Sequence, residues 1–254
     1  MRADDLLSLR GKVALVTGAG HGIGRAYAEA MAECGADVAA VDLRAGAAES
    51  TAEYVRSLGR RAVAVQADVT AEPDVVRAFD EALSGLGRLD VVFANVGGSG
   101  PSEWGTLAEI TLDEWQRTIQ FNLTTAMLTV REAARRMPAG GGKIICTASN
   151  WGLVSPDSVR LTPYAAAKGG VVNFVRSAAT LLARQGIQLN AIAPGPIETG
   201  RRTPERAAIT VQRVPLARQG QPDDLKGVAV LLASAASDYM VGVIIPVDGG
   251  LTAW

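Results

Sequence analysis

The stretch Lys12–Gly24, KVALVTGAGHGIG, decides the fold. Its first part, Lys12–Thr17, is a short apolar run rich in β-branched residues, which is typical of a strand buried on both faces. The amphipathic stretch that begins at Gly22 predicts a helix to Cys34, closed by Gly35. A strand, a glycine-rich turn and a helix in this order form the context in which backbone N–H groups bind a pyrophosphate.

The glycines of this turn have separate expected roles. Gly18 allows the sharp bend, Gly22 lets the backbone approach a pyrophosphate, and Gly24 permits close packing of the helix on the strand. A glycine-rich turn alone is weak evidence, but its place between a predicted strand and a predicted helix strengthens the interpretation.

Asp42 ends the next predicted strand, Asp37–Asp42. A carboxylate at this position accepts hydrogen bonds from both ribose hydroxyls of an adenosine and repels a 2′-phosphate. The expected cofactor is therefore NAD and not NADP. His21, the only histidine, and Arg44 are nearby cations that would weaken this discrimination. We expect His21 to be a loop residue near the cofactor and not a catalyst.

Short apolar runs alternate with amphipathic stretches along the whole chain. This rhythm predicts βαβ units, a parallel α/β sheet and helices on both faces. The 254 residues contain no stretch that looks like a linker, so we expect one domain, 1–254. The predicted strands are Lys12–Thr17, Asp37–Asp42, Arg61–Gln66, Leu89–Ala94, Lys143–Thr147, Ile187–Ile192 and Val243–Val247.

Composition and charge exclude several classes of function. The net charge is −1, from 25 basic and 26 acidic residues, which argues against nucleic-acid or membrane-surface binding. No apolar stretch reaches the roughly 20 residues that span a bilayer, and no secretory signal is visible, so we expect a cytoplasmic protein. One histidine and two cysteines nearly exclude a His/Cys zinc site, and no metal is expected.

The segment YAAAK places Tyr164 and Lys168 four residues apart on the predicted helix Tyr164–Arg184. Residues at this spacing share one helix face. A free tyrosine, with a pKa of about 10, is a poor base at neutral pH, but a neighbouring ammonium favours the phenolate. Tyr164 could then exchange a proton with a substrate hydroxyl or carbonyl. Such a pair is usually structural, so this interpretation depends on the rest of the pattern.

The ordered set of motifs resembles the short-chain dehydrogenase/reductase family over essentially the whole chain. The resemblance implies a Rossmann-type, doubly wound sheet of about seven strands and an NAD-dependent oxidoreductase that acts on CH–OH groups. The matching residues are TGAGHGIG at 17–24, Asp42, Asp68 and Val69, Asn95 to Gly97, Asn122, Ser149, YAAAK at 164–168, and Pro194-Gly195 with Ile197 and Thr199.

This resemblance implies a catalytic tetrad. Tyr164 would be the general acid/base, and Ser149 would hydrogen-bond the reacting oxygen. Lys168 would bind the nicotinamide ribose and tune Tyr164, while Asn122 would hold a water that relays protons. The implied cofactor contacts are Gly18, His21, Gly22, Ile23, Gly24, Asp42, Asp68, Val69, Asn95, Tyr164, Lys168, Pro194, Ile197 and Thr199. Of these, Asp68 and Val69 would flank the adenine, and Ile197 and Thr199 would contact the carboxamide.

The chain departs from the family pattern in three places. The usual Asn-Asn-Ala-Gly is Ala94-Asn95-Val96-Gly97, and Ala148 replaces a frequent serine before Ser149. The interval from Ser149 to Tyr164 is about two residues longer than the resemblance predicts. The surplus falls in 154–163, a loop expected to line the substrate site.

Three segments are expected to reach the substrate: 97–106, 150–162 and a candidate lid at 199–221. They offer a mixed polar and aromatic set, which suits a small hydroxylated molecule better than a steroid. The C-terminal residues 247–254, VDGGLTAW, resemble those of sugar and polyol dehydrogenases. We therefore expect oxidation of a secondary alcohol in a sugar or polyol. The candidate substrate contacts are Ser149, Trp151, Arg160 and Tyr164.

Other functions stay open. Arg160 and the lid arginines favour an anionic sugar or sugar acid, unless they are solvated or pair with acids such as Glu198. A carrier-linked 3-oxoacyl reductase would prefer NADPH and a basic docking patch, which Arg131, Arg135 and Arg136 could form. A non-catalytic dinucleotide-sensing protein would not need the intact tetrad.

The family resemblance also implies a homotetramer, with the long predicted helices 112–137 and 164–184 at two-fold axes. Apolar residues line two faces of the second helix, which is consistent with core on one side and a partner on the other.

Overall fold

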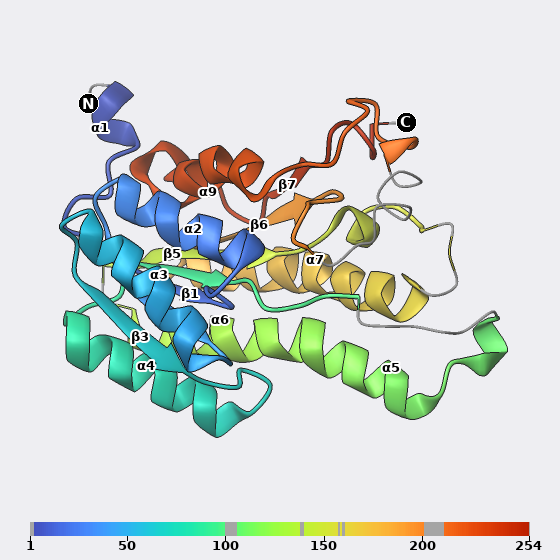
Figure 1. Ribbon diagram of the computed structural model, residues 1–254, viewed down its shortest axis with the longest axis horizontal. Helices are drawn as coiled ribbons and strands as arrows, with labels where there is room; N and C mark the ends of the chain where they lie inside the picture. The colour runs from blue at the N-terminus through green and yellow to red at the C-terminus, as the bar shows by residue number, and fades with distance from the viewer. Residues whose placement is uncertain are drawn as a thin grey trace.

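The computed structural model describes residues 3–99, 106–137, 140–156, 158, 161–200 and 211–253. Within them, seven parallel strands form one sheet in the order β3-β2-β1-β4-β5-β6-β7 (Figure 1). The chain thus winds outward from β1 in both directions, which confirms the predicted Rossmann-type fold. The strands are β1 (Val13–Thr17), β2 (Asp37–Asp42), β3 (Ala62–Gln66), β4 (Val91–Ala94), β5 (Gly142–Thr147), β6 (Ile187–Pro194) and β7 (Ile244–Val247).

Helices connect these strands. The α-helices are α1 (Ala3–Leu6), α2 (Gly22–Glu33), α3 (Ala45–Ser57), α4 (Glu72–Leu86), α5 (Leu112–Ile119), α6 (Thr125–Arg136), α7 (Thr162–Ala183) and α9 (Lys226–Ala233). Short 3₁₀ turns are η1 (Leu107–Glu109), η3 (Asn150–Gly152), η5 (Pro222–Leu225) and η6 (Ala235–Ser237), and η2 (Gln120–Thr124) is a π-helical turn. None of the described helices is long and apolar enough to cross a membrane.

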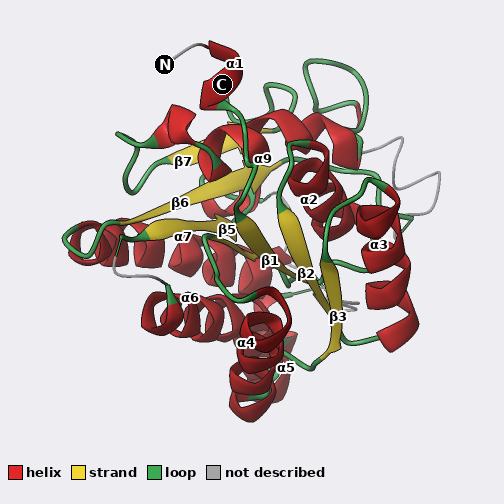
Figure 2. Cartoon of the chain, turned by 90° about the vertical axis from the view of Figure 1, so that its left-hand side faces the viewer, coloured by secondary structure: helices red, strands yellow, loops and turns green. Residues whose placement is uncertain are grey.

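The sheet lies between two helical layers (Figure 2). Along β1, Ala14 and Val16 pack into a core shared with α2 and α9, whereas Val13 and Leu15 pack into a core shared with α4, α6 and α7. Side chains of a strand alternate between faces, so a strand covered on both sides is apolar at nearly every position. This explains the continuous apolar run of β1.

The predicted helix 112–137 is one unbroken helical stretch over 112–136, but its centre is a π-turn and not α-helix. The stretch consists of α5, the π-turn η2 and α6. Within the turn, Asn122 is buried and its Nδ2 donates to the carbonyl of Thr118 over 3.0 Å. A π-turn adds one residue to the helical repeat, and apolar spacing is too coarse to reveal it.

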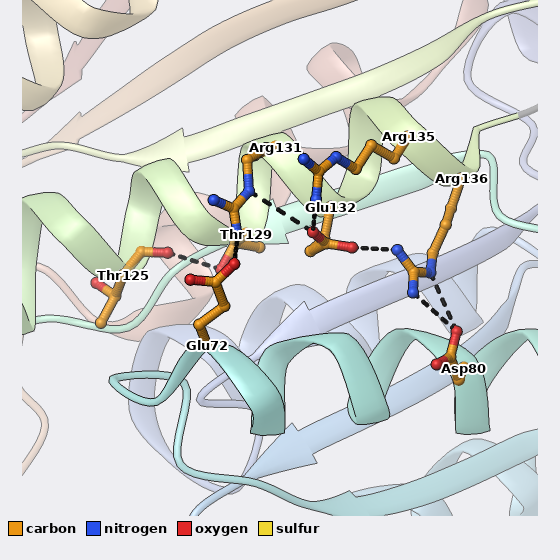
Figure 3. Close-up of polar contacts among 8 residues, drawn as sticks. All are labelled: Glu72, Asp80, Thr125, Thr129, Arg131, Glu132, Arg135 and Arg136. Carbon is orange, nitrogen blue, oxygen red and sulfur yellow. Dashed lines mark hydrogen bonds and ion pairs between the residues drawn. The ribbon is translucent and has the colours of Figure 1, made fainter.

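The arginines of α6 form ion pairs within the chain (Figure 3). The carboxylate of Glu132 is 1% exposed and lies between two of the guanidinium groups. Three arginines meet three acids here, so the surface that a carrier-linked reductase would need as a basic docking patch is locally neutral. The pairs are Arg131–Glu72 at 2.5 Å, Arg131–Glu132 at 3.6 Å, Arg135–Glu132 at 2.8 Å, Arg136–Asp80 at 2.9 Å, and Arg136–Glu132.

Candidate active site

The glycine-rich turn between β1 and α2 has glycine at positions where a side chain would be strained or would clash. Gly18 and Gly22 have φ values of +65° and +55°, which favour glycine. A Cβ on Gly24 would collide with the carbonyl oxygen of Gly18, and a Cβ on Gly22 would lie 3.0 Å from Cγ2 of Thr199. The turn is therefore a cradle that a methyl group would fill, and it fits the pyrophosphate of a dinucleotide.

Asp42 lies beside this cradle and is buried. Its Oδ2 accepts a hydrogen bond from the N–H of Gly20 at 2.9 Å, and its Oδ1 accepts one from the N–H of Arg44 at 3.0 Å. The Arg44 side chain places Nε 3.9 Å from Oδ1 and Nη2 3.3 Å from Nδ1 of His21. The structure thus brings together Asp42, Arg44 and His21, the three residues that the sequence singled out.

Asn95 ties together the ends of three strands. Its backbone N–H and its Nδ2 donate to Oγ1 and the carbonyl of Thr17, each over 3.0 Å. Its Oδ1 accepts a hydrogen bond from Oγ1 of Thr147, also at 3.0 Å. The side chain therefore fixes the carboxyl ends of β1, β4 and β5, where ligands of parallel sheets bind.

Lys168 and Tyr164 come from the first turns of α7. Nζ of Lys168 is buried, donates to the carbonyl of Thr147 over 2.7 Å and lies 5.9 Å from the centroid of the Tyr164 ring. Burial lowers the pKa of Lys168 to about 8, although nearby Cys146 acts in the opposite direction. The ammonium therefore carries its charge at pH 7 in a site of low polarity, where its effect on the phenol is strong.

Asn122 lies on η2, and its side chain is close to Nζ of Lys168. Its Oδ1 accepts from the N–H of Gly98 at 2.9 Å, and its Nδ2 donates to the Gly98 carbonyl at 3.0 Å. A Cβ on Gly97 would lie 2.6 Å from Oδ1 of Asn122 and 2.9 Å from Nζ of Lys168. Gly97 is therefore the point at which the amide and the ammonium converge, a role that no local sequence signal predicts.

Ser149 follows β5 and begins η3. Its side chain is 4% exposed, and its Oγ accepts from the N–H of Trp151 at 3.2 Å. The turn packs closely on α7, because a Cβ on Gly152 would lie 2.7 Å from the carbonyl oxygen of Lys168. This contact holds η3, and Ser149 at its start, against the turn of α7 that carries Lys168.

The segment after β6 packs against the glycine-rich turn. Ile197 is buried and forms a β-bridge with Gly220, while Thr199 lies on Gly22. Pro194, at the end of β6, is also buried.

Of the two residues predicted to flank the adenine, Val69 is buried, and Oδ1 of Asp68 accepts from the N–H and the hydroxyl of Thr70 at 2.9 and 2.7 Å.

A groove of about 540 Å³ lies along the first turn of α7, where Thr162, Ala165 and Ala166 line it; Tyr164 is not part of its lining. Part of its lining comes from the loop 154–163, which is longer than the resemblance predicts. Trp151, which precedes this loop, is half-buried, whereas Arg160 and positions 201–210 of the candidate lid lie outside the described residues. The groove is lined by Val154, Ser155, Pro156, Ser158, Thr162, Ala165 and Ala166.

Comparisons with known proteins identify the family. A family model described as enoyl-(acyl carrier protein) reductase matches residues 18–252. The chain belongs to the short-chain dehydrogenase/reductase family. The cyclohexanol dehydrogenase of Rhodococcus sp. (strain TK6) is 40% identical and aligns over 98% of each chain. The cis-4-hydroxycyclohexanecarboxylate dehydrogenase of Sinomonas cyclohexanicum is also 40% identical, over 95% of this chain and 97% of its own.

Solved structures agree with the sequence relatives. A 7α-hydroxysteroid dehydrogenase complexed with NADH and 7-oxo glycochenodeoxycholic acid has a TM-score of 0.91 at 33% identity and 98% coverage of both chains. Other similar structures are named with NADPH. This short-chain dehydrogenase/reductase is thus an oxidoreductase that acts on the CH–OH group of secondary alcohols with a nicotinamide dinucleotide.

Proposed function

We propose that this short-chain dehydrogenase/reductase uses NAD to oxidise a secondary alcohol on a small saturated ring, the class that includes cyclohexanols and cyclic sugars. The observation that carries the proposal is the buried ammonium of Lys168, 5.9 Å from the centre of the Tyr164 ring at the carboxyl end of the sheet. A structural Tyr–Lys pair has no need to bury its charge beside a cofactor cradle.

The proposed chemistry uses the tetrad Asn122, Ser149, Tyr164 and Lys168. Tyr164, as a phenolate favoured by Lys168, takes the hydroxyl proton of the alcohol. Ser149 donates a hydrogen bond to the same oxygen while it becomes a carbonyl. The bound nicotinamide supplies the acceptor for the hydride that leaves the carbinol carbon. Asn122 holds Gly97–Gly98 in place and, as predicted, a water that returns the proton to solvent.

The choice of NAD rests on Asp42. Its carboxylate lies at the cradle, where it would accept from the adenosine ribose and repel a 2′-phosphate. The nearby guanidinium of Arg44 reduces this repulsion without removing it. The proposed cofactor contacts are Gly18, His21, Gly22, Ile23, Gly24, Asp42, Asp68, Val69, Asn95, Tyr164, Lys168, Pro194, Ile197 and Thr199.

The substrate class is supported by the groove and by the names of the relatives. The groove along the first turn of α7 is lined by small apolar and hydroxyl side chains, which suit a ring with one or a few hydroxyls. Two relatives at 40% identity are named for ring alcohols. The predicted sugar or polyol substrate belongs to the same reaction class and stays a prediction.

A second candidate is an anionic ring alcohol. The name of the Sinomonas relative contains a carboxylate. In the sequence, Arg160 precedes α7 and offers a cation for such a group, and it remains a proposed contact together with Ser149, Trp151 and Tyr164. A carrier-linked substrate is disfavoured, because the arginines of α6 pair with acids of the chain itself. The intact tetrad likewise disfavours a purely sensing protein.

The deciding experiment follows NAD+ and NADP+ reduction with cyclohexanol, cis-4-hydroxycyclohexanecarboxylate, polyols, sugars and sugar acids. We expect turnover of at least one ring alcohol with NAD+, and its loss in Tyr164→Phe. Tight NAD+ binding with no turnover of any alcohol would support the sensing protein instead.

We further propose one domain over 1–254 with a substrate lid at 199–221, a cytoplasmic location and a homotetramer. Support for assembly comes from large apolar side chains left exposed on the stretch 112–137, among them Leu112 and Trp115. Sedimentation tests this assembly, and a clean monomer contradicts it.

A further inference from the structure

Asn150 follows the proposed catalytic serine and has an incompletely satisfied amide. The residue is 2% exposed. Its Oδ1 accepts a hydrogen bond from Oγ of Ser149 at 3.3 Å. Its Nδ2 is buried and has no hydrogen-bond partner among the described residues. Buried polar groups are nearly always paired, so an orphaned donor directly beside a reacting group needs an explanation.

The hydrogen bonds of Ser149 define the problem. Its Oγ accepts from the N–H of Trp151 and gives its only proton to Oδ1 of Asn150. A hydroxyl has one hydrogen to donate. In this arrangement the hydrogen is not available to an alkoxide or a developing carbonyl oxygen, although stabilising that oxygen requires a donor.

A half-turn of the Asn150 amide frees the hydrogen of Ser149 and gives Nδ2 a partner, while Oδ1 takes the buried position without one. A buried acceptor without a partner is less rare than a buried donor without one. The half-turn exchanges Nδ2 and Oδ1, which have nearly the same size. Nδ2 then donates to Oγ of Ser149, which already accepts from Trp151, so both acceptor positions of Oγ are filled. The hydrogen of Ser149 is released to the reacting oxygen, and the buried donor gains a partner.

We infer that Asn150 is a positioning residue that determines whether Ser149 donates its proton to the reacting oxygen. The inference rests on the proposed function, in which Ser149 touches that oxygen. Asn150 does not touch the substrate in this scheme and acts only through Ser149. It needs both ends of its amide, one to hold the hydroxyl at rest and one to release it.

The test is a double-mutant cycle with cyclohexanol and NAD+, measured by single turnover with enzyme in excess. Asn150→Asp can only accept, so it holds the serine proton, and we expect the rate to fall at least about 50-fold at pH 8. Asn150→Leu keeps the approximate size without any hydrogen bond, and we expect a loss of about 5- to 10-fold. In a Ser149→Ala background, both substitutions should change the rate less than about 2-fold, because there is no hydroxyl left to position.

A pH profile separates positioning from a structural role. Once protonated, the carboxyl group introduced by Asn150→Asp could donate to Ser149, so the rate of this variant relative to the wild type should rise as the pH falls. Thermal unfolding and NAD+ affinity, from tryptophan fluorescence, serve as controls and should not follow this ratio. Asn150→Leu carries no buried charge and keeps the test valid if the aspartate variant does not fold.

The outcomes are distinct. If Ser149→Ala retains wild-type turnover, or if the wild type turns over no alcohol, the proposed function fails and this inference fails with it. If Ser149→Ala is impaired but the Asn150 substitutions cause equal losses in both backgrounds, or none in either, only the inference on Asn150 is overturned.

Discussion

The ammonium of Lys168 donates a hydrogen bond to the main-chain carbonyl of Thr147 over 2.7 Å. This bond joins α7 to the end of β5 and holds a charge inside the protein. The carbonyl satisfies one of the three donors of the ammonium, so burial still lowers the pKa of Lys168 to about 8. The site therefore keeps its charge at a cost in stability, and this cost can be measured.

Lys168→Met should stabilise the cofactor-free protein at pH 7 while it abolishes turnover. The pKa falls from 10.5 to about 8 on folding, so the unfolded chain binds more protons between these values. The wild type therefore gains stability as the pH rises from 8 to 10.5, by about 3 kcal/mol at most. Urea unfolding of both proteins at pH 7 to 10 measures the difference, which should narrow with rising pH. A constant difference would contradict a depressed lysine pKa.

Tyr164→Phe should lower kcat at least about 1,000-fold, because the proposed general base is lost. The unfolding temperature should stay near the wild-type value, and the affinity for NAD+ should change far less than kcat. Steady-state kinetics with a ring alcohol provide the measurement. Tyr54→Phe is the matched control, since its hydroxyl bonds Glu33 on α2 at 3.0 Å, and it should leave kcat unchanged. Retained turnover in Tyr164→Phe would refute the proposed mechanism.

Gly97→Ala should damage catalysis through the two groups it would strike. Its methyl group would lie 2.6 Å from Oδ1 of Asn122 and 2.9 Å from Nζ of Lys168, so either both groups or the backbone at residue 97 must move. A displacement of this size lowers kcat by roughly 100-fold. Gly46→Ala, on α3 with nothing within 4 Å of the added methyl group, is the control and should be neutral. Equal kinetics for both variants would show that the convergence at Gly97 has no catalytic role.

Asp42→Ala should shift the cofactor preference toward NADP. Loss of the carboxylate removes its repulsion of a 2′-phosphate and leaves Arg44 to attract it. We expect the ratio of kcat/KM for NADP+ to that for NAD+ to rise roughly 100-fold, equivalent to about 3 kcal/mol. Asp37→Ala, at the other end of β2, should leave the ratio unchanged. An unchanged ratio in Asp42→Ala would remove the basis for proposing NAD.

Glu132→Ala should destabilise the fold more than removal of an exposed acid from the same cluster (Figure 3). The substitution leaves Arg135 and Arg136 without their buried partner. Breaking a buried pair costs about 3 kcal/mol or more, and the partial exposure of the arginines favours the lower value. Glu72→Ala removes an exposed partner of Arg131 and should cost less than about 1 kcal/mol. Chemical unfolding compares the two, and similar losses would contradict a special role for the buried carboxylate.

Local sequence patterns were sufficient to predict where the strands lie. The strand β2 coincides with its predicted bounds, Asp37–Asp42, and the other six strands differ only at their ends. Such runs are recognisable because a strand covered on both faces must be apolar nearly throughout. The four-residue helix Ala3–Leu6 was not predicted, since a single turn has no periodicity to detect.

The candidate site was only partly accessible from sequence. YAAAK and the glycine turn carry spacing that reflects helix and turn geometry, so the positions of Tyr164, Lys168 and Gly24 followed from local rules and the family resemblance. The π-turn that buries Asn122, the convergence at Gly97 and the orphaned amide of Asn150 depend on contacts between distant segments. Periodicity carries no information about such contacts.

By itself, the sequence determined the order of strands and helices, the cradle and the chemical groups available, because periodicity, turn chemistry and residue type are local properties. Only the tertiary structure decided which of those groups meet, how deeply the lysine charge is buried and that the arginines of α6 are already paired. These properties arise from packing between segments that are far apart in the chain, where burial and the local dielectric environment set the strength of each charge and hydrogen bond.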